Sequence, residues 1–336
     1  MKSRFTGYFL AVCTAFLVTC SNNRLDVDLS NLNVQPRFVR FDQQLFDTPV
    51  EGLAEANQRF KSEYSTFYRN YVEAVINVGM VEDPALPSGL KSFVTYPDVR
   101  EIAEMVAATY PDIEQTKAEL VGALRYYHYH FPEKPIPNVY TFISGLNAGI
   151  MVGDQYLGIG LDWYLGEKCP YYVAKGFPQY QIKQQTSEFI ARDAMALWMR
   201  TEYPYDDRNE TLLQRMVYEG KVLYLLDAFF QDRPDHWKIG FSTEQLAWCQ
   251  DKEFNIWGHL VDEKYLYSSE LKVIRQFTGE GPFTRDFEKT SPARTGSWLG
   301  WKIVREFMNS NPEVSLAGLM QMKDPQELLA RSGYRP

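Results

Sequence analysis

The first nineteen residues constrain this chain most, because their pattern is typical of a segment that is cleaved off and is not part of the folded protein. Lys2 and Arg4 form a short basic start, and an uncharged, mainly apolar run follows over residues 5–18. A basic start, an apolar run and a small residue at a cleavage site are the layout of a secretory signal peptide. The run is too short for a spanning helix, which needs roughly 20 apolar residues. We therefore expect residues 1–19 to be a signal peptide.

Cys20 is the residue at which we expect cleavage and lipid attachment. The ending Leu17-Val18-Thr19-Cys20 resembles the lipobox of bacterial lipoproteins, in which the cysteine is acylated and becomes the first mature residue. Thr19 stands where Gly, Ala or Ser is usual. Two alternatives are an ordinary signal with an incidental cysteine and cleavage at Cys13, which would leave only a few apolar residues. The resemblance implies a membrane tether at Cys20.

The mature chain, residues 20–336, is long enough to bury a sizeable core. Its composition, with 45% hydrophobic and 23% charged residues overall, is that of an ordinary globular protein. Without Lys2 and Arg4 the chain keeps 33 basic against 43 acidic residues, a net charge of −10. This charge disfavours nucleic-acid binding and adds no attraction to anionic lipid. Membrane attachment then depends on the acyl chains at Cys20.

The pattern of apolar residues predicts a mainly helical α+β fold. We expect a polar tether over residues 20–35 and one globular domain over residues 36–336. Alternation predicts a strand within 36–46, and strands over 139–144 and 149–161 with a hairpin turn at Gly153-Asp154. These strands should form a small central sheet with an antiparallel part. Helical spacing covers most of the remaining chain, namely 53–78, 98–110, 113–127, 181–200, 209–230, 242–261, 292–309 and 314–320.

Two carboxylates fall on helix faces that should be buried. Asp193 shares a helix face with Ile190, three residues before it, and Leu197, four residues after it. Glu219 likewise has apolar residues three positions before it and four positions after it. A buried ionised carboxylate costs several kcal/mol unless it is paired, protonated or a metal ligand. One hypothesis is a buried charge network of Asp193, Glu219 and Arg294. The alternatives are that both acids reach water at the edge of their faces, or that they belong to a catalytic or metal site.

Several stretches resemble the gliding-motility lipoprotein GldB family. They are Phe189-Ile-Ala-Arg-Asp-Ala-Met-Ala-Leu-Trp-Met-Arg200, Tyr203-Pro-Tyr-Asp-Asp207, Asn209-Glu-Thr-Leu-Leu-Gln-Arg-Met-Val-Tyr-Glu-Gly-Lys221, Leu223-Tyr-Leu-Leu-Asp-Ala-Phe-Phe230, Gly158-Ile-Gly-Leu-Asp-Trp-Tyr-Leu-Gly166 and Ser291-Pro-Ala-Arg-Thr-Gly-Ser-Trp-Leu-Gly-Trp-Lys302. The resemblance covers most of the chain and implies a lipoprotein associated with gliding and its attached secretion machinery. Relatives also occur in bacteria that do not glide.

The family in turn resembles, distantly, a group of zinc peptidase-like proteins. Those proteins pair a His-Glu-x-x-His helix with a following helix that carries Glu-Gly, as Glu219-Gly220 does here. Pro292-x-Arg294-x-Gly296 resembles their third landmark. No histidine lies between His130 and His236, however, and a catalytic zinc needs three protein ligands. The resemblance therefore implies a zincin-like fold with no metal, no cofactor and no catalytic residue.

Other candidate sites are weak. His128 and His130 could share a face on a strand but would diverge at a helix end, and no third metal ligand accompanies them. Cys169 and Cys249 could pair in an oxidising compartment, but buried free thiols fit two distant cysteines better. Neither a serine-hydrolase elbow nor a nucleotide-binding glycine motif is present.

The leading hypothesis is a non-catalytic, acylated lipoprotein that serves an envelope assembly through protein contacts. Ser21-Asn22-Asn23 lacks an aspartate that favours inner-membrane retention and lacks an acidic export tag, so we expect the outer membrane, facing the periplasm. One alternative is a zincin-like hydrolase of peptide or cell-wall material with Glu219 as base or ligand. Another is a ligand-binding lipoprotein that uses the degenerate cleft.

Overall fold

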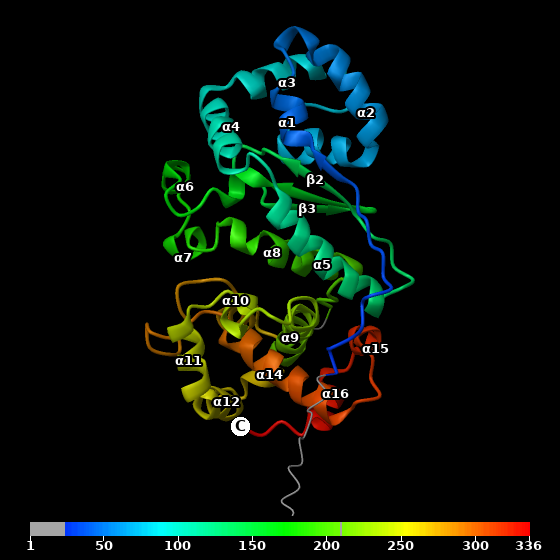
Figure 1. The fold of residues 1–336 in the computed structure, drawn as a ribbon. Coiled ribbons are helices and arrows are strands. Elements are labelled where there is room, and N and C mark those ends of the chain that lie inside the picture. Colours follow the sequence, from blue (N-terminus) through cyan, green and yellow to red (C-terminus); the bar gives the residue numbers. More distant parts are fainter. Residues whose placement is uncertain (1–23, 209) are drawn as a thin grey trace, which may run out of the picture.

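The computed structural model describes residues 24–208 and 210–336. The expected signal peptide and Cys20 lie outside these residues. Within them the chain is mainly helical with one small sheet, so the predicted α+β class is confirmed, whereas the zincin-like character stays a prediction. Figure 1 shows an elongated body, with α1 to α4 at one end, the sheet in the middle, and α15 and α16 at the other end.

The sheet has four strands in the order β1-β2-β4-β3. The strands are β1 (Phe38–Arg40), β2 (Asn138–Phe142), β3 (Ile150–Gly153) and β4 (Tyr156–Gly160). β2 runs parallel to both β1 and β4, and β3 pairs antiparallel with β4 at the edge. The turn between β3 and β4 contains Asp154 and Gln155, and Gln155 adopts the left-handed conformation, with φ of 58°. The predicted hairpin is therefore confirmed.

Sixteen α-helices surround this sheet in the described part of the chain. The first five are α1 (Phe41–Phe46), α2 (Leu53–Asn70), α3 (Leu86–Thr95), α4 (Pro97–Thr109) and α5 (Glu114–His130). The others are α6 (Pro170–Ala174), α7 (Gln179–Ile182), α8 (Ile190–Glu202), α9 (Leu212–Phe229), α10 (Asp235–Ile239), α11 (Thr243–Asp251), α12 (Glu253–Asp262), α13 (Leu271–Thr278), α14 (Thr295–Ser310), α15 (Leu316–Gln321) and α16 (Pro325–Ser332).

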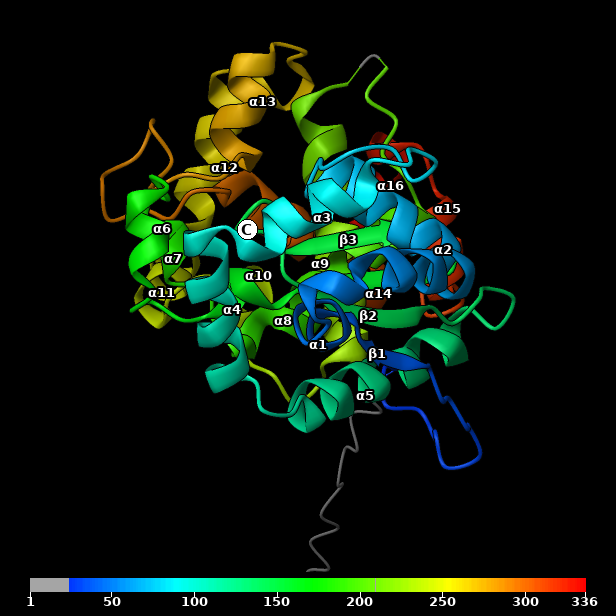
Figure 2. The same ribbon diagram turned by 90° about the horizontal axis from the view of Figure 1, so that it is seen from above.

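The two faces of the sheet belong to two hydrophobic clusters. Tyr140 and Phe142, two residues apart on β2, point into an aromatic cluster with α1 and α2. Phe67 stacks on Tyr140 there, with ring centroids 4.2 Å apart. Leu157 and Ile159 on β4 point the other way, into the larger cluster with α5, α8, α9 and α14. Figure 2 shows the first layer from above, with α1, α2 and α3 over the strands.

Three predicted elements differ from the structure in their limits. Only residues 38–40 of the expected strand are extended, because Phe41 and Leu45 are fully buried one helical turn apart on α1. The helix expected over 181–200 begins at Ile190, after two short turns. The capping box at Ser242 and Gln245 is present, but its helix ends at Asp251 and α12 follows.

The closest helix contact joins α9 to α14. A Cβ atom on Gly220 would lie 2.3 Å from the carbonyl carbon of Gly300, and one on Gly300 would lie 1.8 Å from the carbonyl oxygen of Met216. No side chain fits at either position, so the two backbones are in direct contact. Gly220, the second residue of the Glu219-Gly220 landmark, therefore serves the packing of the two helices.

We predict that Gly300→Ala destabilises the protein by about 3 kcal/mol or prevents folding, because the added methyl group overlaps backbone atoms of α9. Gly122→Ala is the matched control, since Gly122 lies within α5 and a Cβ there meets nothing within 4 Å. That substitution should stabilise the helix by about 0.5–1 kcal/mol. Chemical denaturation of both variants measures the difference, and similar unfolding free energies would contradict the backbone contact.

Candidate functional site

A cavity of about 500 Å³ lies between the sheet edge and the helices α8, α9 and α10. Part of its wall is aliphatic, and its other side chains are aromatic, amide-bearing or charged. They include Trp163, Tyr164, Tyr180, Gln181, Gln184, Gln185, Arg192, Asp193, Arg200, Lys238, Glu280 and Arg294. The volume is within the range of small-molecule sites. This cavity is the candidate site.

The cavity brings two of the three predicted charged residues to one wall. Asp193 and Arg294 line it, and Glu219 is linked to it through Arg200. Each of the three has its own partner. Asp193 pairs with Arg192 at 2.8 Å, Glu219 with Arg200 at 2.6 Å, and Arg294 with Glu280 at 3.3 Å. The side chains of Asp193 and Glu219 are 31% and 17% exposed, so water reaches both.

Arg192 organises the wall of the cavity on α8. Its guanidinium donates to Asp193, to the carbonyl of Trp237 at 2.9 Å and to the amide oxygen of Gln184 at 3.0 Å. Tyr164 completes the arrangement by donating its hydroxyl to Asp193 at 3.1 Å. Because these groups satisfy one another, the charged wall offers no excess charge to a ligand.

Asp162 fixes the loop beside the cavity, and the sequence analysis did not single it out. Its fully buried carboxylate accepts the backbone N–H groups of Ser144 and Leu146, at 3.0 and 2.7 Å. Burial raises the pKa of Asp162 to about 6, although these hydrogen bonds act in the opposite direction. The short 3₁₀ helix Leu161–Tyr164 then places Trp163 and Tyr164 on the cavity wall.

A second charge network, centred on Asp227 of α9, is more deeply buried than the predicted one. The Asp227 side chain is 6% exposed and accepts from Lys238 Nζ at 2.9 Å and from Trp301 Nε1 at 2.9 Å. Arg305 donates to the same carboxylate at 2.7 Å and also binds Asp235. Burial lowers the pKa of Arg305, but the hydrogen bonds to Asp235 and Asp227 outweigh it and raise the pKa.

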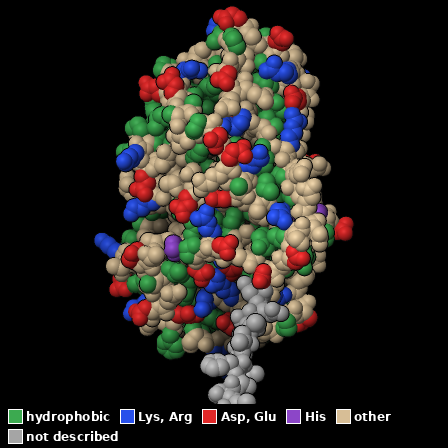
Figure 3. Space-filling model, viewed as in Figure 1, with side chains coloured by type: hydrophobic (Ala, Val, Ile, Leu, Met, Phe, Trp, Pro, Cys, Tyr) green, Lys and Arg blue, Asp and Glu red, His purple; other side chains and the backbone are tan. Residues whose placement is uncertain are grey.

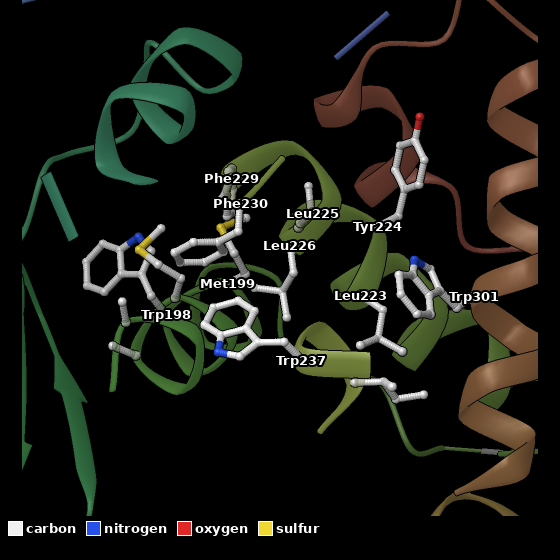
Figure 4. Close-up of a cluster of buried hydrophobic side chains, with 14 of the residues drawn as sticks. Trp198, Met199, Leu223, Tyr224, Leu225, Leu226, Phe229, Phe230, Trp237 and Trp301 are labelled. Atoms are coloured by element: carbon white, nitrogen blue, oxygen red, sulfur yellow. The ribbon is translucent and has the colours of Figure 1, made fainter. Parts of the chain in front are cut away.

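The Asp227 network sits at the edge of the largest apolar cluster. Figure 4 shows this cluster, with Phe230 and Trp237 beside Leu226 and with Trp301 on the neighbouring helix. The rings of Phe230 and Trp237 lie 5.1 Å apart. One feature of the sequence indicated a buried charge here, because Asp227 is the only charged residue in the apolar run 222–230. Its partners Lys238 and Arg305 lie on other helices and carried no such signal.

Gln185 is a buried group without a partner on the cavity wall. Its side chain is 1% exposed, and no residue that the structure describes hydrogen-bonds to its amide oxygen or nitrogen. A buried amide without hydrogen bonds is costly and calls for an explanation such as a bound molecule. Its neighbour Gln184, by contrast, is bonded to Arg192.

The histidines and cysteines take structural positions in the described chain. His128 and His130 lie at the end of α5, where helical geometry separates them, and burial lowers the pKa of His130 to about 4. Cys169 and Cys249 are buried free thiols. Among residues 24–208 and 210–336 no three His, Cys, Asp or Glu side chains gather closely enough to hold a metal. The absence of a metal in the protein stays a prediction.

Comparison with known proteins shows a family match. The family described as gliding motility protein GldB matches residues 22–336, which confirms the resemblance found in the sequence. No curated protein and no solved structure matches the chain.

We predict that Asp227→Asn lowers the free energy of unfolding by about 3 kcal/mol or more, because it leaves Lys238 buried without its carboxylate. Glu219→Gln should change it by less than about 1 kcal/mol, since Glu219 and Arg200 are partly exposed. Denaturant titration of the two variants compares them directly. Equal losses would contradict the assignment of Asp227 as the buried charge centre.

Proposed function

We propose, because the chain belongs to the gliding motility protein GldB family, that it is an acylated lipoprotein serving the gliding and secretion machinery through protein contacts. The family match carries the proposal, since it begins at residue 22, two residues after Cys20. The body common to the family therefore starts where the lipid anchor would end. Attachment at Cys20 to the outer membrane, facing the periplasm, is part of the proposal.

Anchoring by lipid is compatible with the rest of the chain. No helix in the described part is long and apolar enough to cross a bilayer. A single acyl chain binds only marginally, so stable attachment needs the several acyl chains that lipoproteins carry at this cysteine. Acidic and basic side chains are interspersed over the face shown in Figure 3, and no stripe of one sign is visible there.

The exposed apolar side chains support contact with another protein. Four of the eight large hydrophobic side chains exposed in the described chain lie between residues 254 and 271. Phe254 and Val261, seven residues apart on α12, share one face of that helix, and Tyr267 and Leu271 follow. Exposed aromatic side chains are frequent anchors of protein interfaces. We propose that this α12–α13 surface contacts an envelope protein.

We predict that a tagged copy isolated from intact envelopes retains a defined set of envelope proteins. Phe254→Ser should lower the amount of these proteins that is retained by more than about tenfold. Val173→Ser is the matched control, because Val173 is 64% exposed against 70% for Phe254 but lies apart on α6. Quantitative mass spectrometry of the isolated material measures both effects. If nothing is retained with the wild-type protein, the assembly role is wrong.

Gln185 favours a second candidate function, a lipoprotein that binds a small molecule in the cavity. The amide offers two N–H donors and one acceptor oxygen to a cavity of about 500 Å³. Because the charged wall is internally paired, a neutral, hydrogen-bonding ligand fits better than an ion. Aromatic faces from Trp163 and Tyr180 would cover its apolar parts.

We predict that Gln185→Leu stabilises the ligand-free protein by about 1–3 kcal/mol, because it removes a buried amide without partners. Gln184→Leu should lower stability by about 2 kcal/mol, since it breaks the hydrogen bond to Arg192. Thermal or chemical unfolding compares the two variants. Native mass spectrometry of material from envelopes should show a bound mass on the wild type alone. A less stable Gln185→Leu protein without any bound mass would contradict the ligand site.

A further inference from the structure

The described chain begins on the helical end of the body that carries α14, α15 and α16. The guanidinium of Arg24 donates to the carbonyl oxygens of Met308, Asn311 and Val314. The last carbonyls of a helix have no partner within the helix, and a cation is favourable there. Arg24 therefore binds the end of α14 by satisfying groups that need a donor.

The residues after Arg24 stay on the body as well. Leu25 is buried, and its carbonyl accepts from the side chain of Gln231. The carbonyl of Leu29 accepts from Arg125, and Val34 is buried in the larger hydrophobic cluster. The segment from Arg24 to Val34, which we call the seated segment, is therefore fixed to the body at four points. Figure 1 shows it in blue, running from beside α15 toward the sheet.

Covalent geometry then limits how far Cys20 can be from the end of α14. Four residue steps separate Cys20 from Arg24, and an extended chain covers at most 3.3–3.6 Å per residue, or about 14 Å in all. If the whole tether of residues 20–35 were free, its reach would be about 50 Å. The seated segment therefore removes most of the freedom that the tether's length would allow.

We propose that the body is held in one orientation, with the end formed by α14, α15 and α16 against the lipid surface and α1 to α4 pointing away from it. This inference rests on the proposed lipid anchor at Cys20. The partner is the headgroup region of the membrane that holds the acyl chains. The candidate cavity, between the sheet and α10, then lies away from the lipid, and so does the aromatic cluster with α1 and α2.

Chain length, and not charge, sets this orientation. Residues 311–336, which include α15 and α16, carry three acidic and three basic side chains, so this end has little net charge. The mature chain as a whole is acidic and gains nothing from anionic lipid. The orientation should therefore be the same at low and high salt, where exposed charges are screened.

Energy transfer from the acylated protein to labelled lipid headgroups tests the orientation. Glu327→Cys on α16 and Lys91→Cys on α3 introduce one exposed thiol at each end, while Cys169 and Cys249 are buried. The full chain, acylated in cells and reconstituted in vesicles, is labelled at either position. We expect several-fold higher transfer from position 327 than from position 91, at low and high salt alike. Equal transfer, or higher transfer from position 91, would overturn the orientation.

A longer tether provides the control. Twelve Gly and Ser residues inserted between Asn23 and Arg24 raise the reach of the tether to about 55 Å and should remove most of the difference. A difference that survives the insertion would show that something other than tether length orients the body, against the proposal. A flotation assay distinguishes failure of the lipid anchor from failure of the orientation. Protein that does not float with vesicles contradicts the anchor itself, whereas floating protein with equal transfer contradicts the orientation alone.

Discussion

The burial of α9 on nearly all sides is the constraint on which the rest of the structure depends. A helix without a solvent-exposed face must satisfy the hydrogen bonds of its polar groups inside the protein. The carboxylate of Asp227 accepts hydrogen bonds from Lys238, Arg305 and Trp301. The helix must also be approached closely by its neighbours, and Gly220 and Gly300 allow α14 to reach its backbone. α9 lines the candidate cavity, and Arg24 binds the end of α14.

The sequence predicted what local patterns determine. Alternation and a glycine turn predicted the β3–β4 hairpin, and the capping box at Ser242 was read correctly. The sequence did not predict the features that depend on contacts between distant residues. Phe41 follows an alternating run, yet it lies in a helix because it fills the centre of an aromatic cluster built by α2. Asp193 and Glu219 stood out by their spacing, whereas Asp227 needed partners from α10 and α14 that no spacing predicts.

Two features of the structure bear on the proposed function, namely the candidate cavity and the seated segment. The charged groups of the cavity wall are paired with one another, because Arg192, Arg200 and Arg294 each have a carboxylate partner. Gln185 is the side chain on that wall whose buried amide has no hydrogen-bond partner among the described residues. This arrangement favours binding of a neutral group over acid–base chemistry. The seated segment begins with Arg24, which binds the end of α14. In the proposed arrangement, a body anchored through Cys20 presents the same faces to the periplasm.

The proposed attachment of this body to a membrane through Cys20 underlies both the function and the orientation. Mass spectrometry of the N-terminal peptide from protein purified out of the envelope tests it most directly. We expect a mature chain that starts at Cys20, with the mass of the peptide raised by acyl groups on that residue. A chain that keeps residues 1–19, or one that starts elsewhere without lipid, would contradict the claim.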